Sequence, residues 1–129
     1  MIHLSLVHNK VYDEIAIALK PYEISIQQYN VLSILRGQQG KPANLSTINE
    51  RMVSKMSNTT RLVDKLIMKE FVVRKICKQN RRKVEISITQ KGLHFLNEVD
   101  GILFETERML LQNFKEHELI QLNQLLDKF

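Results

Sequence analysis

Apolar residues recur at steps of three and four along most of this 129-residue chain, and that spacing predicts a mainly helical fold. A first helix is expected over residues 2–19, and Pro21 ends it because proline cannot continue a helix. Ser25 and Gln28 form a capping box that opens a second helix. This helix runs into a loop containing glycine and proline at residues 37–42.

Two further helices are predicted close together in the middle of the chain. The first is short and covers residues 44–52, with Thr47 and Glu50 spaced as a capping box. After a turn, a second begins behind Ser57, whose hydroxyl is suited to accept an amide hydrogen bond from the first helical turn. Residues 58–69 therefore complete a helix-turn-helix.

The helix over residues 58–69 has two different faces. At 100° per residue, four apolar residues fall within an arc about 140° wide: Leu62, Val63, Leu66 and Ile67. The opposite side carries Asn58, Thr60, Arg61, Asp64, Lys65, Met68 and Lys69. One face is thus expected to pack on a core while the other stays free for a partner.

After Glu70 the apolar period changes from 3.6 to 2, which predicts two strands at residues 71–77 and 83–89. The stretch KQNRRK at residues 78–83 lies between them and holds four basic side chains. We expect a β-hairpin with a cationic tip. The order helix, turn, helix and hairpin is that of a winged helix-turn-helix, so the predicted fold is mainly α with a small β-hairpin wing.

Long apolar stripes also mark both ends of the chain. Thr89 is placed to cap a helix that reaches about Leu111, and another helix is expected after Asn113. A winged-helix core needs only the middle of the chain, so these stripes would form a large exposed patch on a monomer. We therefore expect one domain, residues 1–129, with a DNA-binding core at 23–91 and dimerisation helices at 1–22 and 92–129.

Charge is segregated along the chain in a way that points to a polyanionic partner. Residues 51–91 contain twelve Lys and Arg against three acids, a net charge of +9, whereas the remainder carries −4. Double-stranded DNA is the expected partner. A homodimer would present two recognition helices about 34 Å apart, matching the half-sites of a palindromic operator.

The predicted DNA contacts divide by chemistry. Base edges in the major groove suit Arg61, Asn58 and Thr60, because Arg pairs well with guanine and Asn with adenine. Lys65 lies on the same helix face. Phosphate contact is the expected role of a second set: Lys55, Ser57, Arg81 and Lys83.

The run ERMVSKMSNTTRLVDKLIMKEFVVRK, then NRRKVEISITQKG and the late ELIQLNQLLDKF, resembles the MarR family of bacterial transcriptional regulators. QQYNVLSILRG, near position 30, belongs to the same resemblance, which covers nearly the whole chain in order. It implies a winged-helix homodimer that usually acts as a repressor. Family members commonly carry Asp-x-Arg in the wing; the matching positions are Asn80 and Arg82, so Arg82 is expected to enter the minor groove without that aspartate.

The resemblance has two further implications. Many family members respond to small phenolic or lipophilic ligands bound between the dimerisation helices and the winged domain, so a small-molecule effector would lie among the first, second and fifth helices. The family also commonly has glycine where Glu70 stands, which argues against a left-handed helix end at this residue.

Several classes of function are not supported by the sequence. It contains no phosphate-binding glycine loop, no nucleophile elbow and no HExxH motif, so an enzyme is not expected. The four histidines lack helical metal-site spacing, and neither a metal nor a cofactor is expected. Lone Cys77 excludes an internal disulfide, fits a reducing cytoplasm and is interpreted as a packed side chain rather than a redox sensor.

No apolar run approaches membrane-spanning length, and residues 1–10 do not have a signal-peptide pattern, so a cytoplasmic protein without a membrane partner is expected. The alternative to a DNA-binding regulator is a winged helix used only for contact with protein or RNA.

Overall fold

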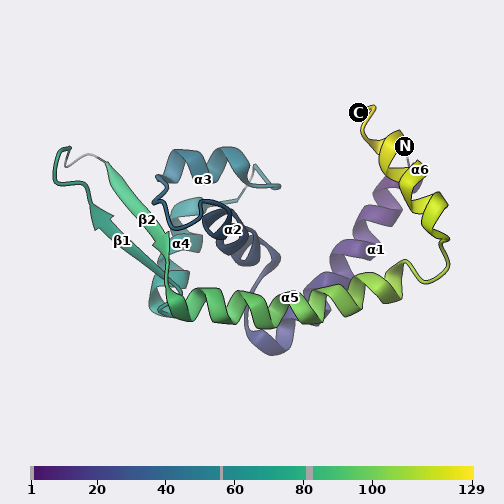
Figure 1. The fold of residues 1–129 in the computed structure, drawn as a ribbon, viewed down its shortest axis with the longest axis horizontal. Coiled ribbons are helices and arrows are strands. Elements are labelled where there is room, and N and C mark those ends of the chain that lie inside the picture. The colour runs from purple at the N-terminus through teal and green to yellow at the C-terminus, as the bar shows by residue number, and fades with distance from the viewer. Residues whose placement is uncertain (1, 56, 81–82) are drawn as a thin grey trace.

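The computed structural model describes residues 2–55, 57–80 and 83–129. Within them the chain forms six α-helices, one short 3₁₀ helix and one two-stranded sheet, so the predicted mainly α fold with a β-hairpin wing is confirmed (Figure 1). In chain order these are α1 (Ile2–Leu19), η1 (Lys20–Tyr22), α2 (Ile26–Gly37), α3 (Leu45–Arg51), α4 (Thr59–Met68), β1 (Val72–Ile76), β2 (Val84–Ile88), α5 (Gln90–Leu110) and α6 (Glu116–Leu126).

Two of the predicted helix starts are confirmed. Ser25 and Gln28 form the reciprocal capping box of α2, with the Ser25 hydroxyl accepting from the Gln28 amide at 3.0 Å. Thr89 caps α5 by accepting from the Gly92 amide at 3.0 Å. A polar capping residue next to a clear apolar period therefore predicted the start of both α2 and α5 correctly.

The caps predicted for the other two helices are wrong, because asparagine takes the capping role in both. Asn44 caps α3 by accepting from the Thr47 amide at 2.7 Å, so Thr47 and Glu50 are not its capping box. Asn58, not Ser57, caps α4, and its side chain accepts from the Arg61 amide at 3.1 Å. Both asparagines have an extended backbone, which lets the side-chain oxygen turn back onto the first turn.

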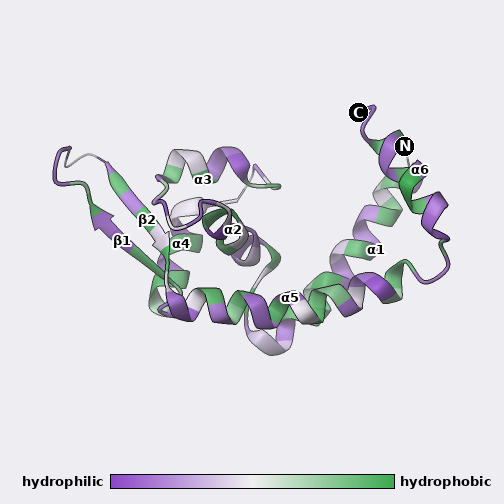
Figure 2. Cartoon of the chain, viewed as in Figure 1, coloured by the Kyte–Doolittle hydropathy of each residue, from purple (hydrophilic) through white to green (hydrophobic). Residues whose placement is uncertain are grey.

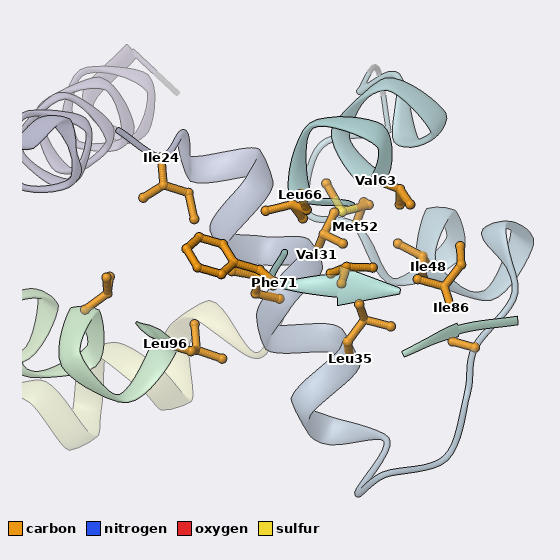
Figure 3. Close-up of a cluster of buried hydrophobic side chains, with 14 of the residues drawn as sticks. Ile24, Val31, Leu35, Ile48, Met52, Val63, Leu66, Phe71, Ile86 and Leu96 are labelled. Atoms are coloured by element: carbon orange, nitrogen blue, oxygen red, sulfur yellow. The ribbon is translucent and has the colours of Figure 1, made fainter. Parts of the chain in front are cut away.

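The hydrophobic core lies among α2, α3, α4, the sheet and the first half of α5 (Figure 3). Its fully buried members include residues from each helix of the winged core, and Ile86 joins it from β2. The largest of them are Leu19, Leu32, Leu35, Ile48, Met52, Leu66, Ile86 and Leu96. Burial of this set gives the helix-turn-helix a rigid support within one chain.

The start of α5 lies unusually close to the segment that leads into β1. A Cβ added at Gly92 would lie 2.3 Å from the Phe71 carbonyl oxygen, so only glycine fits there. The Phe71 ring stacks on Phe95 of α5, with the ring centroids 4.3 Å apart. Gly92 therefore lets α5 pack against the base of the wing.

The wing is a regular antiparallel hairpin with an additional bridge. Val72 pairs with Ile88 and Ile76 with Val84 at the two ends of the ladder. On the other edge of β2, Ala43 and Ile86 exchange backbone hydrogen bonds of 2.9 and 2.7 Å. A single residue has no period of its own, so the sequence did not indicate this bridge, which fastens the segment before α3 to the wing.

Glu70, which follows the C-cap residue of α4, has a left-handed conformation with φ of 64°. The Phe71 amide donates to the Leu66 carbonyl at 3.0 Å, and the Glu70 amide donates to the Ile67 carbonyl at 2.9 Å. These two bonds define a Schellman motif. The argument against a left-handed end, made from the absence of glycine, is therefore wrong; the backbone bonds and the buried Phe71 hold Glu70 there.

The terminal helices differ sharply from this core. Helix α5 leads away from the wing, and α1 and α6 lie at its far end (Figure 1). Hydrophobic residues run along α1, α6 and the outer part of α5 (Figure 2). Leu19 is the one buried residue among those described in α1, and α6 has none. None of the described helices combines the length and apolar character that crossing a membrane requires.

Candidate nucleic-acid interface

Two side-chain hydrogen bonds fix the angle of the helix-turn-helix. The buried Thr59 hydroxyl, in the first turn of α4, donates to Asn49 of α3 at 2.9 Å. In the turn itself, the Val53 amide donates to Asn30 of α2 at 2.9 Å. Neither bond follows from the sequence, because periodicity assigns residues to helix faces and does not pair polar groups between helices. Together they hold α4 at a set position on the core.

The outer face of α4 is free for a partner. Thr60, Arg61 and Lys65 are all exposed, and among the described residues neither basic side chain has an ion pair. An open groove of about 470 Å³ runs beside them, lined by Gln27, Ser54, Ser57, Asn58, Arg61, Leu62 and Lys65. The predicted division of the helix into a packed face and a free face is thus present.

Two residues before α4 are less available than the sequence suggested. The Ser57 hydroxyl is buried and has no hydrogen-bond partner in the described part of the chain, so its position does not favour the expected phosphate contact. The Lys55 ammonium donates to the Glu50 carbonyl near the end of α3, although the side chain is exposed. Lys55 therefore has a helix-capping contact of its own.

The wing is tied to α4 by an ion pair that the sequence analysis missed. Arg74 of β1 donates to Asp64 of α4 at 3.0 Å. Arg74 contributes to the positive charge of residues 51–91, but Asp64 compensates its charge. This pair holds the hairpin beside the outer face of α4.

At the wing tip, Lys83 is exposed and its amide donates to the Asn80 carbonyl at 2.9 Å. Arg81 and Arg82, predicted to contact phosphate and the minor groove, lie outside the described residues. Cys77, at the end of β1, is half-buried and is not in a disulfide. In the described part of the wing, the basic side chains without an ion pair are those of Lys75, Lys78 and Lys83.

A polar cluster joins α2 to α5 on the side away from the wing. The Tyr29 hydroxyl donates to Asp100 at 2.7 Å, and Arg36 donates to the other oxygen of the same carboxylate. The members are separated by 71 and 64 residues along the chain, so no local pattern indicated them. The cluster connects the helix-turn-helix to the long helix that carries the C-terminal part.

The three groups of this cluster stabilise one another's ordinary protonation states. Burial, followed by the hydrogen bond to Asp100, raises the pKa of Tyr29. Partial burial alone would raise the pKa of Asp100, but hydrogen bonds from Arg36 and Tyr29 outweigh it and lower that pKa. The hydrogen bond to Asp100 raises the pKa of Arg36. At neutral pH the cluster thus contains a neutral phenol, a carboxylate and a guanidinium.

A cavity of about 380 Å³ lies next to this cluster, between α1, α2 and α5. Most of its lining is aliphatic, and it consists of Val11, Ile15, Tyr29, Leu103, Glu107, Leu110 and Leu111. This is the place where the family resemblance located an effector. Within the described residues, no group of three or more His, Cys, Asp or Glu is arranged to hold a metal ion.

Comparison with known proteins points to one family. A family model described as MarR matches residues 24–84, which include α2, α3, α4 and β1. Over this segment the chain is similar to the MarR family. It is 29% identical to the transcriptional regulator PecS of Dickeya dadantii over 128 residues, covering 97% of this chain and 74% of PecS.

Solved structures show the same MarR fold. A mutant of Escherichia coli MarR complexed with operator DNA has a TM-score of 0.85 and 21% identity, with 97% of this chain and 89% of that chain covered. A structure concerning regulation of DNA binding of Bordetella bronchiseptica BpsR by 6-hydroxynicotinic acid has a TM-score of 0.84 and 16% identity, with 97% and 88% covered. These likenesses show that the chain has the winged-helix fold of these proteins.

Proposed function

We propose that two copies of this MarR-like chain pair through α1, α6 and the outer half of α5, and that the homodimer represses transcription from a palindromic operator. In this proposal residues 23–91 form the DNA-binding core, and residues 1–22 and 92–129 form the pairing segments. The exposed apolar side chains of the terminal helices support pairing, since water contact at so many of them is unfavourable. A dimer placed over an operator would exclude polymerase from the same DNA.

The observation that carries the proposal is the geometry of α4. Its inner face packs Val63 and Leu66 into the core, while Arg61 and Lys65 project from the exposed face without a paired acid among the described residues. The Asp64–Arg74 pair holds the wing next to that face. A two-fold axis would place two such helices about 34 Å apart, in successive major grooves on one side of the duplex.

The proposed contacts refine the sequence predictions. Arg61 is the main reader of a base edge, with Thr60 beside it. The Asn58 oxygen already accepts the Arg61 amide, so Asn58 is left with its NH₂ group to donate to a base acceptor. Phosphate contact is assigned to Lys55, Lys65, Arg81 and Lys83, and no longer to the buried Ser57 hydroxyl.

Arg82 is assigned to the minor groove, where the narrow groove of A·T-rich DNA attracts a guanidinium. Asn80 stands where the family commonly has aspartate, so this wing lacks a carboxylate at that position. We infer that the hydrogen bond from the Lys83 amide to the Asn80 carbonyl shapes the turn instead.

We also infer that a small effector occupies the cavity between α1, α2 and α5. The cavity touches both the proposed pairing helices and α2 of the DNA-binding core through Tyr29. A ligand with different affinity for two arrangements of these helices would shift the population of dimers whose α4 helices fit the operator. BpsR, which has the same fold, is a protein whose DNA binding is regulated by 6-hydroxynicotinic acid.

Salt dependence of duplex binding tests the proposed contacts. Each phosphate neutralised by a cation should contribute a slope of about −0.9 to a plot of log K against log salt concentration. A dimer with several phosphate contacts per protomer should therefore bind far more weakly at high salt. A flat dependence would contradict the assigned phosphate contacts and would favour a protein or RNA partner for the winged helix.

A further inference from the structure

We propose that the cavity between α1, α2 and α5 takes a hydrophobic aromatic amine, protonated at neutral pH, in preference to an aromatic carboxylate of the same size. The proposal rests on the effector role given to this cavity above and specifies the charge of its ligand. Two observations support it: the polar groups that line the cavity, and the hydrogen-bond and ion-pair partners that these groups already have.

The lining is suited to hydrocarbon but offers no cation. Five of its seven residues are aliphatic, contributed by α1, by α5 and by Leu111 directly after α5. The other two are Tyr29 and Glu107, and the lining contains no lysine, arginine or histidine. A buried carboxylate ligand would lose its hydration without gaining an ion pair, which is strongly unfavourable.

The one hydroxyl in the lining is already engaged. The Tyr29 hydroxyl donates a hydrogen bond to Asp100 at 2.7 Å, and that carboxylate also accepts a hydrogen bond from Arg36. A ligand anion would have to break the first bond to use the phenol as a donor. The nearby guanidinium is likewise held by Asp100, so neither donor is available to an anion.

Glu107 is the group that favours a cation. Its carboxylate has no ion pair within the described part of the chain, whereas nearby Arg108 is paired with Glu105 at 3.4 Å. Glu107 follows Asp100 by seven residues, so both carboxylates project from roughly the same side of α5. An ammonium group at Glu107 would form a charge-assisted hydrogen bond while the attached ring contacts Leu103, Leu110 and Val11.

Three probes with one skeleton test the preference: 2-naphthylmethylamine, 2-naphthalenemethanol and 2-naphthoate. Binding of each to the full-length protein would be measured by isothermal titration calorimetry at low salt. We expect the amine to bind about tenfold more tightly than the alcohol, the usual effect of one charge-assisted bond, and the carboxylate to bind most weakly.

The variant Glu107→Gln keeps the shape of the side chain and removes its charge. It should abolish the advantage of the amine over the alcohol. Glu105→Gln is the matched control, because it removes a carboxylate on the same helix that is paired with Arg108 and lies outside the cavity lining. It should leave the ranking of the three probes intact.

The proposal is overturned if the carboxylate binds most tightly, if Glu107→Gln leaves the ranking unchanged, or if none of the probes binds to a protein that still binds DNA. Failure of the regulatory role would look different. In that case the amine would bind with the expected preference, but operator affinity would be the same with and without it.

Discussion

The winged core and the terminal helices make opposite use of their apolar residues. In the core, α2, α3, α4 and the sheet turn their apolar faces toward one another, and residues such as Leu32 and Ile48 are completely buried. In the terminal helices, apolar side chains at similar spacing remain exposed: Ile17 is 64% exposed and Ile120 is 54% exposed. The core buries its apolar residues within a single chain, whereas the terminal helices leave theirs exposed, and the proposal assigns that exposed surface to a second copy.

This contrast shows that a regular apolar stripe specifies a buried surface but does not specify what buries it. The apolar face of α4 is buried within its own chain because α2, α3 and β1 pack against it. The stripe of α5 is covered only over its first half, where Leu96 and Val99 meet the core. The second half of α5 then extends beyond the core that covers the first half.

The largest effect expected from this contrast comes from two leucine truncations. Leu66→Ala removes a fully buried core side chain and should lower the free energy of unfolding by about 3 kcal/mol at every protein concentration. Leu125→Ala, at a residue 51% exposed in α6, should instead weaken dimerisation about tenfold, because it removes three carbon atoms from the proposed pairing surface. Chemical denaturation and sedimentation over a range of protein concentrations would separate these outcomes. If both variants lowered the free energy of unfolding equally at every concentration, the contrast between the core and the terminal helices would be wrong.

A second comparison uses two glycines of α5, one in each half of the molecule. Gly92→Ala places a methyl group against the Phe71 carbonyl and should destabilise the fold by about 2 to 3 kcal/mol. Gly101→Ala has nothing within 4 Å of the added carbon and should stabilise the helix by about 0.5 to 1 kcal/mol. Thermal unfolding measures both; destabilisation by Gly101→Ala would mean that this exposed part of α5 is tightly covered.

Within the DNA-binding half, Arg61→Ala should cost about 1 to 3 kcal/mol of binding at the specific site and relax discrimination at one base position. The reason is that Arg61 projects from the exposed face of α4 without a protein partner among the described residues. Fluorescence anisotropy with a set of single-base operator variants measures this change.

Lys83→Ala is the matched control, because Lys83 belongs to the wing and is assigned to phosphate. It should weaken binding to all duplexes alike and make the salt slope shallower by about one unit. If Arg61→Ala gave this uniform pattern too, α4 would not be the reader of the base sequence.

The smallest effect is expected at Glu70, where a non-glycine residue holds a left-handed conformation with φ of 64°. Glu70→Gly should raise the midpoint of thermal unfolding slightly, because glycine adopts this conformation without steric strain. The loss of the exposed Lys91–Glu70 pair, 2.9 Å long, offsets part of the gain. A clearly lower midpoint would mean that the ion pair outweighs backbone strain.

Local periodic signals predicted most of the fold. The capping box at Ser25, the change of period after Glu70 and the cap at Thr89 each lie within a few residues of the element they specify. Errors arose where two polar residues competed for one role, as when Asn58 rather than Ser57 capped α4. Side-chain oxygens of both types reach the same amides, so chain geometry selects between them.

The missing parts of the candidate site all depend on residues distant in sequence. The Thr59–Asn49 bond, the Asp64–Arg74 pair and the Tyr29–Asp100–Arg36 cluster join different elements. Their members have no shared period, and each looks like an ordinary polar surface residue until the helices are packed. Charge segregation indicated where DNA would bind but did not reveal which basic residues were already paired.

The most direct test is selection of bound duplexes from a random pool, using the full-length protein. If the core reads DNA and the terminal helices pair two copies, the selected sites should be inverted repeats with half-site centres about ten base pairs apart. Mixing the protein with such a site should give a complex containing two chains. Selection of a single unrepeated site bound by one chain would contradict the account.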